Sequence, residues 1–194
     1  MDSHADSFTV MATGQIESAE IPGCSNAFCK FEIVHGDDWQ LLDGTEEGLT
    51  QVARQGTGSG RELVWNFPLD ATYKSTNAFG WPQMVVSVYG LDMFGRDVVK
   101  GYGSTHLPTC AGRHTCKIRL YRPKSASIMK EFIAWVTGMP AEFSDPKFPS
   151  FGDGREVVRV ASSGFINLQI NLLTKDMELF GYQVTKEATA KTGS

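Results

Sequence analysis

Strict alternation of apolar and polar residues is the feature that most limits what this chain can fold into. Its clearest example is the run Ile166-Asn-Leu-Gln-Ile-Asn-Leu172, in which aliphatic side chains occupy every second position. Successive side chains of a β-strand point to opposite faces of the sheet. The run therefore predicts a strand that buries its aliphatic face and turns its amide side chains outward.

The same period recurs along the chain. Further strands are expected at 29–33, 63–67, 84–89 and 157–160. Turn segments that contain glycine or proline separate them, at 22–23, 36–38, 56–60, 90–95, 108–112 and 152–154. Many short strands joined by such turns, without a regular alternation of strand and helix, favour an all-β fold, an antiparallel sandwich or barrel.

One short inserted helix is expected near residues 127–137. Ile128, Phe132 and Trp135 recur at helical spacing, and Gly138 follows at the place where a helix would end. The apolar stripe of this helix would pack against the sheet.

A chain of 194 residues is long enough for one domain with its own core. We expect a single domain at 14–184, between a flexible N-terminal extension at 1–13 and a flexible polar tail at 185–194. No stretch approaches the roughly 18 consecutive apolar residues of a transmembrane helix. The N-terminus lacks the apolar core of a secretory signal, and four cysteines do not make a disulfide framework. These features predict a cytoplasmic protein.

The formal net charge of −4 is unevenly distributed. Residues 1–48 contain ten acidic residues and one basic residue, whereas residues 96–130 contain eight basic residues and one acidic residue. The two segments can pair with each other in the fold, or each can be solvated. Alternatively, the basic segment forms a contact surface for lipid headgroups or for an acidic partner.

Within the basic segment, a β-strand would place Lys117, Arg119 and Tyr121 on one face. The residues between them, Ile118 and Leu120, would then point to the core. Other basic residues extend this candidate surface only if the fold brings them to it. The candidate lipid- or partner-binding residues are Lys100, Arg113, Lys117, Arg119, Tyr121 and Lys124.

Motifs for catalysis or for a cofactor are weak. The segment Gly56–Gly60 lacks the Gly-Lys-Ser/Thr ending of a phosphate-binding loop. The cysteine pairs at 24/29 and 110/116 are spaced more widely than the usual zinc ligands. The four histidines are scattered, and no serine or cysteine lies in a nucleophile motif. We expect no enzymatic activity, no metal, no cofactor and no nucleic-acid partner.

Residues 87–103 resemble the calcium-binding loop of C2 domains, because a strand leads into a loop that carries glycine and aspartate. Calcium needs several clustered oxygen ligands. Gly90 and Asn26 stand where such a site would need carboxylates, and only Asp92 and Asp97 remain in the loop. Calcium binding is therefore not expected.

Long and unusual strings make the chain resemble the B9 domain family of ciliary proteins. They are the segments 63–70, 74–83, 87–103, 154–160, 174–177 and 181–182, and the resemblance covers roughly residues 14–182. It implies a C2-like β-sandwich and a non-enzymatic structural adaptor of the Meckel syndrome (tectonic-like) complex. In that role the protein would support ciliogenesis and the membrane diffusion barrier.

The resemblance also implies partners and a location. The partners would be the two other B9-domain proteins, with tectonic-type and Meckel-type membrane proteins around them. The protein would lie in the cytoplasm, at the ciliary basal body and transition zone, associated with the cytoskeleton. An alternative function is a peripheral phospholipid-binding module that works without calcium and meets an anionic membrane surface through its basic residues.

Overall fold

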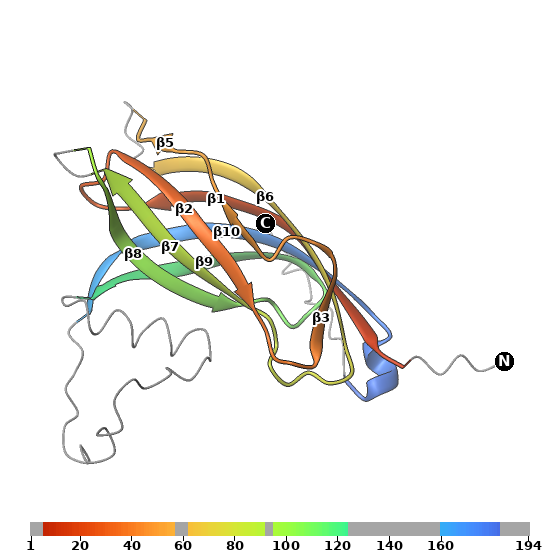
Figure 1. Cartoon of the computed structure of the whole chain (residues 1–194). Helices are drawn as coiled ribbons and strands as arrows, with labels where there is room; N and C mark the ends of the chain where they lie inside the picture. Colours follow the sequence, from red (N-terminus) through yellow and green to blue (C-terminus); the bar gives the residue numbers. More distant parts are fainter. Residues whose placement is uncertain (1–5, 57–61, 92–94, 124–159, 183–194) are drawn as a thin grey trace, which may run out of the picture.

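The computed structural model describes residues 6–56, 62–91, 95–123 and 160–182, and within them the chain is almost entirely β-sheet (Figure 1). The strands are β1 (Phe8–Glu20), β2 (Asn26–Val34), β3 (Trp39–Gly44), β4 (Glu47–Leu49), β5 (Ala53–Arg54), β6 (Glu62–Ser75), β7 (Gln83–Leu91), β8 (Asp97–His106), β9 (Gly112–Pro123) and β10 (Val160–Lys175). They pair in the order β3-β6-β1-β10-β9-β8-β7-β2-β4, and β5 also pairs with β2. Every pairing is antiparallel.

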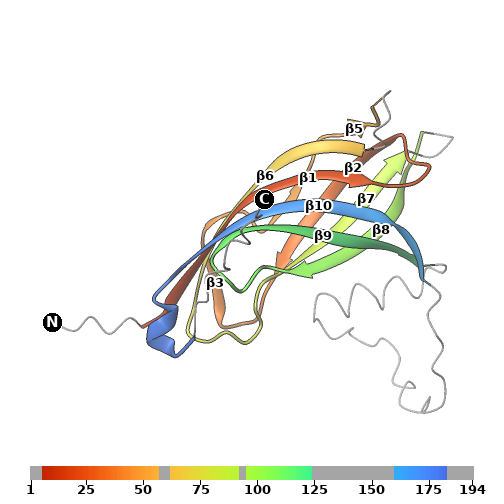
Figure 2. The same cartoon turned by 180° about the vertical axis from the view of Figure 1, so that it is seen from behind.

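The sheet curls over so that its two halves face each other across a core. Strands β6, β1, β10 and β9 form one curved layer, and β8, β7 and β2 lie opposite (Figures 1 and 2). The indole Nε1 of Trp65 on β6 donates a hydrogen bond to the carbonyl of Ala27 on β2, at 3.1 Å. The rings of Phe31 and Phe67 meet from the same two strands, with centroids 5.7 Å apart. The predicted all-β antiparallel sandwich is confirmed.

The core follows the alternation that the sequence predicts. On β10, the four aliphatic residues from Ile166 to Leu172 are buried, and the amide residues between them are half-buried on the other face. On β2, Cys29, Phe31 and Ile33 are buried in the same way. Removing a large aliphatic or aromatic side chain from water contributes about 1.5–3 kcal/mol, so these inward faces hold the layers together.

The first strand begins earlier in the chain than the predicted domain boundary. The sequence predicts an N-terminal extension up to residue 13, but β1 already begins at Phe8, because Phe8 and Val10 continue its alternation and are fully buried. The helix expected near residues 127–137 and residues 185–194 of the predicted tail lie outside the described residues. The strand expected at 157–160 also lies outside them, except for Val160, where β10 begins.

The helical element in the described part is instead a 3-10 turn, η1 (Met177–Phe180), which directly follows β10 and which the sequence pattern does not predict. No helix in this part of the chain is long and apolar enough to cross a membrane.

Irregular positions in β1 and β10 shape the outer face of the curved layer. The register of β1 against both neighbours shifts between Ile16 and Ser18. The β9–β10 register shifts between Ser162 and Gly164. Gly164 has a φ of 130°, and a Cβ there would collide with the carbonyl of Glu20, so only glycine fits.

Candidate interaction surface

A row of cations runs along the outer face of β9. Arg113, Lys117 and Arg119 are exposed at alternate positions of the strand, while Ile118 and Leu120 are buried between the layers. In Figure 2, β9 lies beside β10 on this side of the molecule. The structure therefore brings together three of the six predicted residues, and we call them, together with Phe165 of β10, the β9 face.

Phe165 gives the β9 face an aromatic member. The Nζ atom of Lys117 lies 4.6 Å from the centroid of the Phe165 ring. Such a cation–π contact contributes about 0.5–1 kcal/mol at an exposed site. Phe165 is not among the residues predicted from the sequence, although its place beside the buried Ile166 puts an aromatic ring on the polar face of the predicted strand.

The cations of the β9 face have no acidic partner among the described residues. In that part of the chain the ion pair found is His35 with Glu46, at 2.8 Å. The neighbouring strand β10 places amides opposite the row, with Asn167 against Lys117 and Asn171 against Arg113. The expectation that these cations pair with acids from residues 1–48 on a neighbouring strand therefore finds no support in the described structure.

The acids of the N-terminal segment that come nearest in strand order lie on β1, beyond β10. There, Glu17 accepts a hydrogen bond from the side-chain amide of Gln169, at 3.3 Å. Asn167 likewise donates to the hydroxyl of Ser18, at 3.0 Å. The amide ladder of β10 thus contacts β1 and lies between the acids and the cations.

Of the other three predicted residues, Tyr121 continues the alternation of Lys117 and Arg119 on β9. Tyr121 is half-buried, and it pairs with Tyr102 where β9 meets β8. Tyr102 is only 4% exposed, and burial raises its pKa, with the nearby Tyr89 adding to the rise. Lys124 lies outside the described residues.

Lys100 does not join the row. The β7–β8 register shifts between Val88 and Tyr89, and Lys100 occupies the extra position on β8. A Cβ at Gly90 would come within 2.8 Å of both the Lys100 Cε atom and the Cys24 Sγ atom, so the lysine lies over Gly90 beside Cys24. Burial raises the pKa of Cys24, and the charge of Lys100 partly offsets that rise.

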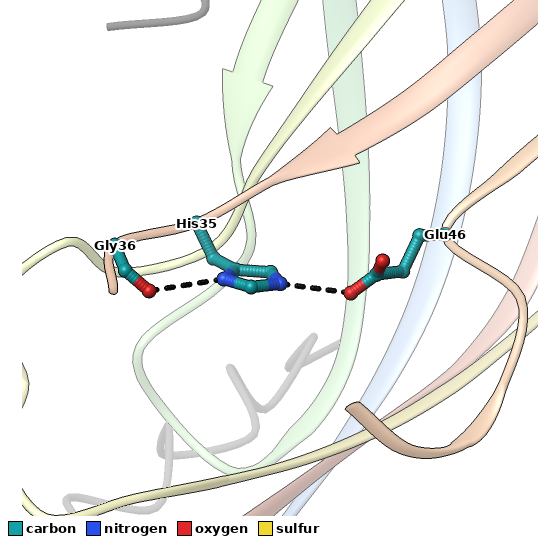
Figure 3. A network of polar contacts seen from close by, with 3 residues as sticks. All are labelled: His35, Gly36 and Glu46. Atoms are coloured by element: carbon teal, nitrogen blue, oxygen red, sulfur yellow. Dashed lines mark hydrogen bonds and ion pairs between the residues drawn. The ribbon is translucent and has the colours of Figure 1, made fainter. Parts of the chain in front are cut away.

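A second polar group lies at the end of β2 (Figure 3). The Nδ1 atom of His35 lies 3.0 Å from the Gly36 carbonyl, and its Nε2 atom lies 2.8 Å from Glu46 Oε1. Both ring nitrogens thus lie within hydrogen-bond distance of an oxygen acceptor. The contact joins the β2–β3 turn to the β3–β4 turn. No group of residues that could hold a metal ion is found in the described part of the chain.

A family model described as "Ciliary basal body-associated, B9 protein" matches residues 10–173. The chain belongs to the B9 domain family. B9 domain-containing protein 1 of Mus musculus is 49% identical, over 90% of this chain and 86% of the relative. Its Xenopus laevis counterpart is 47% identical, over 94% of this chain and 92% of the relative. B9 domain-containing protein 2 of Homo sapiens is 32% identical, over 90% of this chain and 98% of that protein.

Among solved structures, a C2 domain of a plant extended synaptotagmin 1 aligns with 86% of this chain and 93% of that chain. Its TM-score is 0.43 and its sequence identity 13%, so this likeness is too weak to support a conclusion.

Burial raises the pKa of three of the four cysteines of this B9 domain. All four are free. Burial raises the pKa of Cys29 to about 12, against a small opposing effect of a hydrogen bond from the Ser87 backbone. Burial also raises the pKa of Cys116. A nucleophilic or zinc-binding cysteine needs a lowered pKa, so Cys24, Cys29 and Cys116, which lie in or against the core, fill space in the sandwich.

Proposed function

We propose that this B9 protein is a non-enzymatic structural adaptor of the Meckel syndrome complex at the ciliary transition zone. There it supports ciliogenesis and the membrane diffusion barrier, in the cytoplasm and close to the cytoskeleton. Membership of a family described as ciliary basal body-associated supports this proposal. Its partners in the proposal are the two other B9-domain proteins, with tectonic-type and Meckel-type membrane proteins around them.

The observation that carries the proposal is the β9 face. Its three cations have no acidic partner in the part of the chain that the structure describes, and an aromatic ring lies under one of them. Arginine and aromatic residues are enriched at protein interfaces. A partner that presents carboxylates to this face would gain charge-assisted hydrogen bonds from Arg113 and Arg119.

The same row of charges also suits an anionic membrane. Each Lys or Arg near such a surface contributes about 1 kcal/mol, and salt weakens the attraction. The alternative function, a calcium-independent peripheral lipid-binding module, therefore uses the same residues, and the experiment has to separate the two.

The test is the double variant Lys117→Glu/Arg119→Glu, measured for binding to each purified sister B9-domain protein and to anionic lipid vesicles at low salt. A matched control is Lys30→Glu/Arg54→Glu, which makes the same change of net charge at exposed positions on β2 and β5. The adaptor proposal expects the first variant to stay folded and to lose binding to at least one sister protein, while the control binds as wild type. Loss of vesicle binding alone would favour the lipid module. Undiminished binding to both sister proteins would exclude the β9 face as their contact surface.

A further inference from the structure

Phe79 lies in the loop between β6 and β7 with its side chain 86% exposed. This is the largest exposure of any large apolar side chain in the described structure. Single exposed apolar residues are common on protein surfaces and need no special explanation. What distinguishes Phe79 is the loop that presents it.

Hydrogen bonds fix the backbone on both sides of the exposed ring. The Phe79 amide donates to Oδ1 of Asn77 at 2.8 Å, and the Phe79 carbonyl accepts from the indole Nε1 of Trp39, also at 2.8 Å. The amide of Ala78 donates to the hydroxyl of Tyr182 at 3.0 Å. The peptide groups flanking Phe79 are thus held by residues from three separate parts of the chain.

The loop also packs directly against the β2–β3 turn. The Gly36 amide donates to the Gly80 carbonyl at 2.9 Å. Gly80 has a φ of 69°, and a Cβ there would lie 2.5 Å from the Gly36 Cα atom, so the close approach requires glycine. The side-chain amide of Asn77 adds a 2.6 Å hydrogen bond to Asp38 of the same turn.

Trp39, which donates the hydrogen bond to the Phe79 carbonyl, belongs to an aromatic cluster. The Trp39 ring packs edge-on against Trp81 and Phe8, with centroids 5.0 Å and 5.6 Å away. Phe8 in turn contacts Phe180 and Tyr182, which places η1 beside the loop at the end of the molecule where β3 lies (Figure 1). Leu179 of η1 is 67% exposed at this end.

This arrangement resembles an anchor at a protein interface. A loop whose backbone is already ordered loses little backbone entropy on binding, so only the Phe79 side chain remains to be ordered. Large aromatic residues that fill a partner's pocket carry much of the energy of protein interfaces. The exposed ring of Phe79 buries little of its own surface in the fold, although the surrounding backbone is held in place.

The charges beside the loop indicate the kind of partner. Asp6, Asp37 and Asp38 line a surface hollow next to it, and Lys74 is the one cation in that lining. An anionic membrane would be repelled by these carboxylates, whereas a protein surface with lysine or arginine around an apolar pocket would be attracted.

We propose that Phe79, with Leu179 also exposed at this end of the molecule, anchors a second interaction surface by entering a basic-rimmed apolar pocket of a sister B9-domain protein. This surface differs from the β9 face in position and in sign of charge. The choice of partner rests on the proposed function, since that partner comes from the same assembly.

The test is to titrate the full chain, the variant Phe79→Ala and the control Val52→Ala with each purified sister B9-domain protein. Val52 is 60% exposed next to β5, at the opposite end of the sandwich (Figure 1), so its variant truncates an exposed apolar side chain far from Phe79. We expect Phe79→Ala to weaken binding to one sister protein by roughly tenfold to thirtyfold. It should keep the wild-type melting temperature, and Val52→Ala should bind normally. Asp37→Lys should weaken the same complex, and more so at low salt.

Wild-type affinity of Phe79→Ala for both sister proteins would overturn this inference and leave the adaptor function standing. If the wild-type chain binds neither sister protein, this inference and the proposed adaptor function are both wrong. A parallel sedimentation with phosphatidylcholine–phosphatidylserine vesicles adds a further outcome. If the wild type binds them and Phe79→Ala does not, Phe79 is a membrane anchor and the inference of a protein partner is wrong.

Discussion

Trp65 links the two layers of the sandwich through a single side chain. It is buried on β6, and its indole donates to the Ala27 carbonyl of β2. Replacing it with alanine would empty a large site and leave that carbonyl without its donor. We expect Trp65→Ala to lower the free energy of unfolding by about 3–5 kcal/mol, measured by urea denaturation.

The neighbouring Val64 provides the control, because it lies on the exposed face of the same strand. Val64→Ala should change the free energy of unfolding by less than about 0.5 kcal/mol. Equal effects of the two substitutions would show that the inward face of β6 is wrongly assigned.

Two buried groups make stability depend on alkaline pH. Burial raises the pKa of Cys29 from 9.0 to about 12, and burial together with Glu46 raises the pKa of Tyr73 above its ordinary value of 10.0. A group whose pKa is higher in the folded state stabilises the fold fully below its unfolded pKa. That contribution is lost as pH rises toward the folded value. The free energy of unfolding should therefore fall above about pH 9, by about 1.4 kcal/mol per pH unit for Cys29, and more steeply once Tyr73 ionises in the unfolded chain.

Denaturation curves between about pH 8 and 10.5 measure this slope. Cys29→Ala should reduce it from about pH 9 upward, and Tyr73→Phe should reduce it only above about pH 10. A slope that is the same in wild type and in Cys29→Ala would mean that the thiol ionises as readily in the folded chain as in the unfolded one.

At the level of strands and turns, the loop between β7 and β8 is expected not to bind calcium. Gly90 lies buried opposite Ala27 in the β2–β7 pair, so it supplies no carboxylate, and Asp97 is exposed at the start of β8. Calcium needs several oxygen ligands in one place. The melting temperature should be the same in millimolar calcium and in chelator. A rise of several degrees that disappears in Asp92→Ala or Asp97→Ala would contradict this, because a ligand specific for the folded state stabilises it.

Period-two alternation predicted β2, β6, β7 and β10 because each of them buries a single apolar face. It did not predict β1, in which Val10, Met11 and Ala12 form an unbroken apolar run. It missed β3, β4 and β5, whose residues are mostly exposed, so that their pairing leaves little trace in the hydropathy pattern. It also missed η1, a single turn in which one residue, Met177, is buried.

For the candidate site too, the sequence predicts only those positions that a regular strand fixes. Lys117 and Arg119 could be placed because a regular strand fixes their face. Lys100 could not, since the register shift in β7 and β8 turns it toward Cys24. The exposure of Phe79 depends on contacts with Trp39 and Tyr182, which are distant in sequence and meet only in the folded chain.

For the molecule as a whole, the fold separates opposite charges that the sequence already concentrates in different segments. The β9 face is cationic, and the surface around Phe79 carries three aspartates and one lysine. Two surfaces of opposite sign attract different partners and discourage the wrong pairing. A small β-sandwich of this kind is suited to holding two proteins side by side, which is the work of an adaptor.

Lysine footprinting of the protein, alone and in complex with its two sister B9-domain proteins, tests the adaptor function most directly. The acetylation rate of Lys117 on the β9 face would be compared with that of Lys30, an exposed lysine on the outer face of β2. We predict that assembly without lipid protects Lys117 strongly and leaves Lys30 unchanged. Equal acetylation of Lys117 in the free chain and in the assembled complex would contradict the proposal that the β9 face binds a protein partner.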